Sequence, residues 1–94
     1  MAQDQNHLAW IDMEMTGLSP ERDRIIEIAL VITNAQLEVL AQCPVMVVHQ
    51  PEAIMQSMDA WNTSTHTRSG LIERVKASSL DEAQAEAQIG RAHV

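Results

Sequence analysis

The first half of the chain consists of apolar runs separated by short polar segments, a pattern typical of β-strands joined by turns. Residues 7–15 and 24–33 are rich in apolar and β-branched side chains, and each predicts a strand. A third strand is predicted over residues 37–49, interrupted near Cys43 and Pro44 because proline removes a donor from the ladder. Three consecutive strands with short connections predict an antiparallel meander.

In the second half of the chain, the apolar residues follow a helical spacing. Residues 52–61 predict one helix, residues 62–70 a polar loop, and residues 71–76 a short second helix. Residues 79–82 (Ser-Leu-Asp-Glu) fit a capping box, which predicts the start of another helix. This order of elements indicates an α/β fold with a mixed sheet. Because one or two short helices cannot cover such a sheet, we expect only part of a domain.

Two carboxylates, Asp12 and Glu14, lie within the first predicted strand. Side chains two residues apart on a strand point to the same face, where two negative charges repel each other. Burying either carboxylate unpaired would add a cost of several kcal/mol. A hard divalent cation such as Mg²⁺ or Mn²⁺ removes both problems, and a pair of such ions suits phosphoryl chemistry.

The surroundings distinguish this pair from an Asp-x-Glu triplet that occurs by chance on a solvated surface. The flanking residues are typical of a buried core strand: Leu8, Trp10, Ile11 and Met13. The chain then turns at residues 16–20, which places the pair at a strand end, where a ligand finds room. The pattern therefore favours a metal site over a solvated acidic surface.

Composition and charge narrow the class of protein. The 94 residues are 46% apolar, which permits a small core and argues against disorder. The chain has no apolar run of transmembrane length, no basic segment of a signal peptide, and one cysteine, so we expect a cytoplasmic protein with no membrane contact. The formal charge of −7 argues against binding of long duplex nucleic acid, but not against a short substrate held by metal ions.

The last residues of the chain, 89–94, read Ile-Gly-Arg-Ala-His-Val and break the preceding helical pattern at Gly90. The DNA string ATCGGAAGAGCACACGTC, part of a widely used sequencing-library adapter, translates as this hexapeptide. We therefore interpret residues 89–94 as translated adapter and residues 1–88 as the native part of the chain. The alternative is that the genome itself encodes these residues.

Several segments resemble oligoribonuclease, a DEDD-type 3′-to-5′ exoribonuclease family with an RNase H-like fold. They are residues 10–18, 20–29, 48–50 and 61–71, and the similarity runs from about Leu8 to about Ala87. The first segment alone indicates only the DEDD superfamily, which includes proofreading DNA exonucleases. The block Trp-Asn-x-x-Thr-His-x-x-Ser-Gly-Leu is more specific to oligoribonuclease. The resemblance implies that residues 1–88 are the N-terminal part of an RNase H-like exonuclease domain.

The resemblance implies that Asp12 and Glu14 help to hold two divalent ions, Mg²⁺ or Mn²⁺. One ion would lower the pKa of an attacking water, and the other would stabilise the departing 3′ oxygen. Glu14 would also meet the 3′ hydroxyl of the terminal ribose. The implied substrates are short single-stranded RNA and dinucleotides, and the full-length family is homodimeric.

The resemblance also implies a substrate-binding set: Glu14, Thr16, Gly17, Leu18, Trp61 and His66. Leu18 would wedge between two bases, Trp61 would stack on a base, and His66 would lie near the substrate. Without the resemblance, Leu18 reads as a turn residue packed on the core and His66 as a solvated loop residue. Trp61 reads equally well as the core anchor of its helix.

The chain departs from the family pattern in its later motifs. The family needs a further Asp, then a His acting as general base and another Asp, and these motifs are absent from the sequence. We therefore expect no useful catalysis from this chain alone. Two alternatives are a DEDD DNA exonuclease and a non-catalytic acidic protein that binds a partner through an exposed sheet edge.

Overall fold

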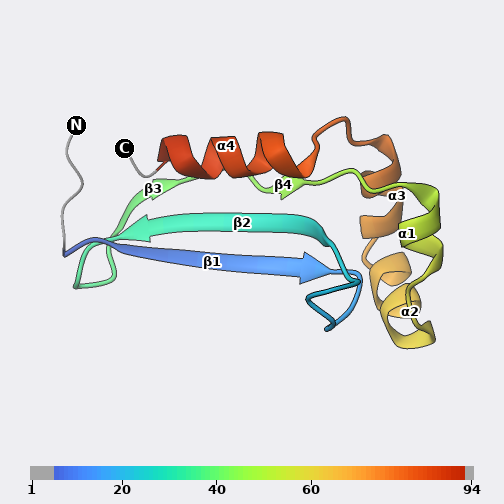
Figure 1. The fold of residues 1–94 in the computed structure, drawn as a ribbon. Helices are drawn as coiled ribbons and strands as arrows, with labels where there is room; N and C mark the ends of the chain where they lie inside the picture. The colour runs from blue at the N-terminus through green and yellow to red at the C-terminus, as the bar shows by residue number, and fades with distance from the viewer. Residues whose placement is uncertain (1–5, 93–94) are drawn as a thin grey trace.

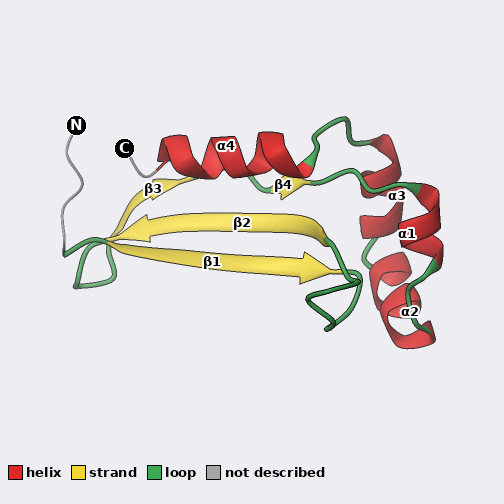
Figure 2. Cartoon of the chain, in the orientation of Figure 1, coloured by secondary structure: helices red, strands yellow, loops and turns green. Residues whose placement is uncertain are grey.

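The computed structural model describes residues 6–92 of the chain, and Figure 1 shows their arrangement. An antiparallel sheet forms the body of the molecule, one helix runs along the sheet, and three short helices gather at one end. Figure 2 shows the same elements by type. The elements are β1 (Leu8–Met15), β2 (Ile25–Thr33), β3 (Val39–Gln42), β4 (Met46–Val47), α1 (Glu52–Gln56), α2 (Ala60–Arg68), α3 (Leu71–Ala77) and α4 (Glu82–Ala92).

Strand β2 is the centre of the sheet. It pairs antiparallel with β1 on one side and with both β3 and β4 on the other. Between these two short strands, the Cys43 N–H donates to the carbonyl of Leu30 at 3.0 Å, so they are two pieces of one interrupted third strand. The predicted meander, with its interruption near Cys43 and Pro44, is confirmed.

The core lies between one face of β2 and the helices. At one end of β2, Ile26 packs with residues of the three short helices: Met55, Met58, Leu71 and Val75. Further along, Ile28 packs with Met46, Val48 and Ala85, the last of which belongs to α4. Helix α4 therefore lies along the sheet and covers it, as Figure 1 shows. These contacts confirm an α/β arrangement of strands followed by helices.

Strand β1 differs from its prediction as a buried core strand. All of its residues are exposed, and Trp10 and Ile11 are 51% and 49% exposed. The indole of Trp10 donates to Thr33 Oγ1 at 3.0 Å but is not covered by a second layer. The physical reason is that no residue of β1 joins either core cluster formed with the described helices. In addition, β1 pairs only with β2 among the described strands, so its other edge is open.

The helical region also differs from its prediction in two places. The single helix expected over residues 52–61 is broken between α1 and α2, and the loop expected over residues 62–70 is mostly helical. Asp59 causes the break, because its Oδ1 accepts from the N–H of Asn62 at 2.8 Å and caps a new helix. Thr67 then bonds back to the Thr63 carbonyl at 2.6 Å, which accommodates a polar side chain inside that helix.

Helices α3 and α4 occur where the sequence predicts them, with two differences of detail. The capping box of α4 is formed by Asp81 and Gln84, whose side chains each accept from the other's N–H at 2.7–2.9 Å, two residues later than predicted. The helix also passes through Gly90, where an interruption was predicted, while Ile89 packs on the core. The adapter origin of residues 89–94 stays a prediction. No helix among residues 6–92 is long and apolar enough to cross a membrane.

Candidate active site

Asp12 and Glu14 lie on one face of β1, and both are exposed. Asp12 is opposite Ala29 of β2, whose small side chain leaves space on this face. Within residues 6–92, neither carboxylate makes a hydrogen bond or an ion pair. Their oxygens are therefore free to accept a cation.

A third carboxylate, Glu27 of β2, is directly opposite Glu14 in the ladder, so it lies on the same face. Two like charges at opposed positions destabilise a strand pair. Arg74 of α3 offsets this, because its Nη2 lies 3.3 Å from Glu27 Oε2. Glu27 could not be assigned to this face from the sequence, because its place beside Glu14 follows from the register of the two strands.

The acidic face fits part of a divalent metal site. Carboxylate oxygens are the donors that Mg²⁺ and Mn²⁺ prefer, and Asp12 and Glu14 present them unpaired and accessible. However, the described part of the chain contains no group of three His, Cys, Asp or Glu side chains that could hold a metal ion. Asp12 and Glu14 therefore fit two ligand positions of a metal site, and the site needs further donors to be complete.

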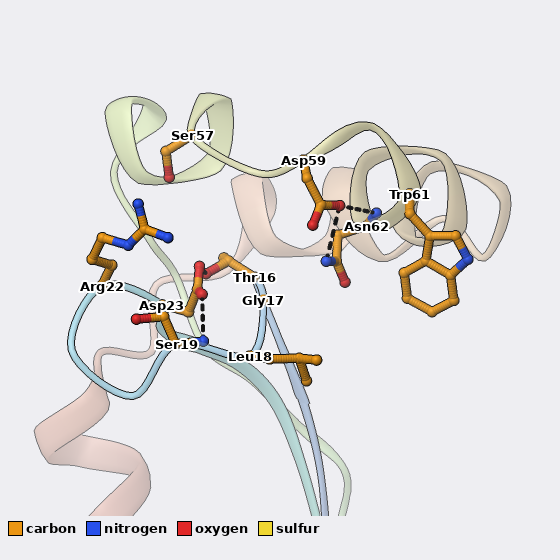
Figure 3. Close-up of a pocket in the computed structure, with 10 residues that line it drawn as sticks. All are labelled: Thr16, Gly17, Leu18, Ser19, Arg22, Asp23, Ser57, Asp59, Trp61 and Asn62. Carbon is orange, nitrogen blue, oxygen red and sulfur yellow. Dashed lines mark hydrogen bonds between the residues drawn. The ribbon is translucent and has the colours of Figure 1, made fainter.

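Directly after this strand, the turn between β1 and β2 forms one wall of a cavity of about 650 Å³. The junction between α1 and α2 and the first turn of α2 supply the opposite wall. Figure 3 shows the side chains that line it: Thr16, Gly17, Leu18, Ser19, Arg22, Asp23, Ser57, Asp59, Trp61 and Asn62. The cavity thus begins two residues after Glu14, at the same end of β1.

Two apolar side chains stand exposed at this cavity. Leu18 is 94% exposed and Trp61 is 71% exposed, and in Figure 3 both extend toward the same side of the cavity. The alternatives of a core-packed Leu18 and a core-anchoring Trp61 are therefore wrong. Exposed apolar groups that flank a concave site are typical of ligand contact.

Thr16 is a buried residue of the cavity lining, whereas His66 is not among the lining residues. His66 is 3% exposed, so the alternative of a solvated loop histidine is wrong. Its Nε2 lies 2.9 Å from the carbonyl of Met15, which can only accept, so Nε2 carries the proton. Thr16 is 1% exposed, and its hydroxyl donates to Asp23 Oδ1 at 2.9 Å. His66 therefore joins the Trp61 helix to the end of β1.

Several polar side chains of the cavity were not singled out from the sequence: Ser19, Arg22, Asp23, Ser57, Asp59 and Asn62. A helix cap at Asp59 could have been predicted, since the pattern Asp-x-x-Asn fits such a cap. In the structure, the Asp59 carboxylate accepts hydrogen bonds from Asn62. The others come from turns, where sequence pattern says little about which way a side chain points.

Comparison with known proteins shows the family to which the chain belongs. The model of the RNase_T family, described as "Exonuclease", matches residues 9–94, and the chain belongs to this exonuclease family. Its relatives include an oligoribonuclease of Azoarcus sp. (strain BH72), 64% identical over 89 residues, which are 95% of this chain and 49% of that protein. An oligoribonuclease of Bordetella pertussis is 63% identical over 86 residues, 92% of this chain and 48% of that protein. The resemblance to oligoribonuclease is confirmed, and the chain spans about half the length of the curated relatives it matches.

Proposed function

We propose that the chain is the N-terminal half of a 3′-to-5′ exoribonuclease that degrades short oligoribonucleotides and dinucleotides by two-metal hydrolysis. The observation that carries this proposal is a juxtaposition at one end of β1. Free carboxylates at Asp12 and Glu14 are followed at once by a cavity flanked by exposed Leu18 and Trp61. A cation-binding face beside a cavity that is flanked by two apolar side chains suits a phosphodiester with bases attached.

In this proposal, Asp12 and Glu14 hold two Mg²⁺ or Mn²⁺ ions together with carboxylates from the rest of the protein. When bound, the ions supply an activated water and stabilise the departing 3′ oxygen. Glu14 also meets the 3′ hydroxyl of the terminal ribose. A histidine outside this sequence would act as general base. The 94-residue chain therefore lacks useful activity, although it carries half of the carboxylates.

The cavity accounts for a short substrate. Trp61 stacks on one base, a contact that tolerates any base because each has a π-face, and Leu18 wedges beside it. The backbone of Gly17 and the buried Thr16 line the approach, and His66 joins the Trp61 helix to the end of β1. A volume of about 650 Å³ is that of a small-ligand pocket, and the charge of −7 disfavours a long strand. We place the full-length homodimeric enzyme in the cytoplasm.

A second candidate function rests on the open edge of β1. Exposed strand edges pair with other chains, and β1 carries half-exposed apolar side chains beside such an edge. In this alternative the chain is a non-catalytic protein that binds a partner. A DEDD DNA exonuclease is the third possibility, and the choice between RNA and DNA distinguishes it.

Mn²⁺-dependent cleavage of an RNA dinucleotide by the full-length protein tests the proposal. Asp12→Ala should abolish cleavage, because it would remove one of the carboxylates that hold the metal ions. Glu86→Gln is the matched control, since it removes an exposed carboxylate on α4 that lines no part of the cavity. Full activity of Asp12→Ala, or cleavage of a DNA dinucleotide in preference to RNA, would contradict the proposed function.

A further inference from the structure

The turn between β1 and β2 closes on itself and exposes the leucine side chain at position 18. The N–H of Thr16 donates to the carbonyl of Arg24 at 2.9 Å, and the N–H of Arg24 donates to Thr16 Oγ1 at 3.0 Å. Between these ends, Leu18 is 94% exposed. A side chain with so few contacts of its own depends on its backbone for its position.

The Asp23 carboxylate fixes that backbone from inside the turn. Its Oδ1 accepts from the hydroxyl of Thr16 at 2.9 Å, and its Oδ2 accepts from the N–H of Ser19 at 2.9 Å. The N–H of Asp23 also donates to the Ser19 carbonyl at 2.8 Å. One side chain thus bridges the two residues on either side of Gly17 and Leu18, as Figure 3 shows.

The close approach of Asp23 to Gly17 is a second, steric indication that the carboxylate packs against this backbone. A Cβ atom at this position would lie 2.5 Å from Asp23 Oδ2 and 2.8 Å from Asp23 Cγ, closer than real Cβ contacts. The carboxylate therefore fills the space that a side chain at position 17 would need. The backbone leading to Leu18 rests directly on Asp23.

We propose that Asp23 is the positioning residue of the substrate pocket. It holds residues 17–19 so that Leu18 projects beside the base stacked on Trp61, and it acts on the substrate through Leu18. The inference rests on the proposed function, in which Leu18 and Trp61 contact bases. It follows that Asp23 governs the binding of substrates with bases and not the chemistry at Asp12 and Glu14.

The test compares two substrates of the full-length protein: an RNA dinucleotide and bis(p-nitrophenyl) phosphate, a phosphodiester without nucleobases. Asp23→Ala should raise KM for the dinucleotide about tenfold with little change in kcat. Hydrolysis of the base-free ester should be unchanged. Asp23→Asn should give a smaller rise, because its amide oxygen keeps one acceptor. Glu21→Gln, an exposed carboxylate of the same turn that lines no cavity, is the control with unchanged KM.

A double-mutant cycle separates positioning from general destabilisation. Leu18→Ala should resemble Asp23→Ala, and the double variant should lose little more than either one, because both changes remove the same contact. Should Asp23→Ala fail to fold, Asp23→Asn decides by the same criteria.

Three results overturn the inference while leaving the proposed function standing. They are an unchanged dinucleotide KM in a folded Asp23 variant, an equal loss on both substrates, and additive losses with Leu18→Ala. A wild-type protein that hydrolyses the base-free ester but no RNA dinucleotide contradicts the proposed function itself, and the inference falls with it.

Discussion

Strands β1 and β2 lie side by side and are both rich in apolar residues, yet their burial is opposite. In β2, alternate residues are buried: Ile26, Ile28 and Leu30 are at most 4% exposed. In β1, no residue is buried. The difference follows from their neighbours. Strand β2 has partners on both edges and helices on one face, whereas β1 has a single partner among the described strands.

This comparison shows that hydrophobicity predicts a strand but not what covers it. The apolar residues of β1 that stay exposed are Leu8, Trp10, Ile11, Met13 and Met15. The relatives are about twice as long as this chain. We infer that additional residues of a longer protein pack on β1 and pair with its open edge. The same residues would bring the missing ligands to Asp12 and Glu14.

The largest expected effect is on the behaviour of the chain as a whole. Alone in solution, the 94-residue chain should bind a hydrophobic dye such as ANS and self-associate, because the apolar face of β1 is open. The full-length protein should bind little dye and give a single species. Dye fluorescence and size-exclusion chromatography measure both properties. A monodisperse 94-residue chain without dye binding would favour the non-catalytic alternative.

A smaller effect is expected from one substitution on each strand. Ile28→Ala should destabilise the chain by about 2–5 kcal/mol, because Ile28 is buried against Met46 and Val48. Ile11→Ala should cost less than about 1 kcal/mol, because Ile11 is half exposed. In the full-length protein, the cost of Ile11→Ala should rise toward that of Ile28→Ala. Urea unfolding of both variants, in the 94-residue chain and in the full-length protein, measures these losses of stability. A loss on Ile11→Ala that stays low in the full-length protein would contradict the expected rise.

The smallest effect concerns acid stability of the turn beside β1. The N–H of Ser19 and then the hydroxyl of Thr16 hold the pKa of Asp23 below its ordinary value of 3.8. Because the folded-state pKa is depressed, Asp23 stabilises the fold above pH 3.8 and loses this effect as the pH falls through the lowered value. The urea midpoint of Asp23→Asn should therefore be below wild type near neutral pH and converge with it at acid pH, once the pH has passed through the lowered pKa. An equal difference between the urea midpoints of wild type and Asp23→Asn at neutral and at acid pH would contradict this assignment.

Local signals made most of the fold predictable. Runs of β-branched residues predicted β2, and Pro44 predicted the interruption of the third strand. The break between α1 and α2 was not predictable from apolar spacing, because Met58 continues the helical pattern although Asp59 caps a new helix. The exposure of β1 was equally hidden, since an apolar run does not show whether a second layer covers it.

The candidate site was predictable where spacing alone defines it. Asp12 and Glu14 share a face because strands have a period of two. The place of Glu27 opposite Glu14 required the strand register, and the role of Asp23 required the folded turn. The burial of His66 depended on the unexpected helix α2, which turns its ring toward Met15.

A titration of the full-length protein with Mn²⁺ by calorimetry tests most directly whether β1 carries half of a two-metal site. Wild type and the control Glu86→Gln should bind Mn²⁺ stoichiometrically. Asp12→Ala and Glu14→Ala should bind at least about tenfold more weakly, and the 94-residue chain should show no stoichiometric binding. Unchanged Mn²⁺ affinity in both β1 variants would contradict a metal site on β1.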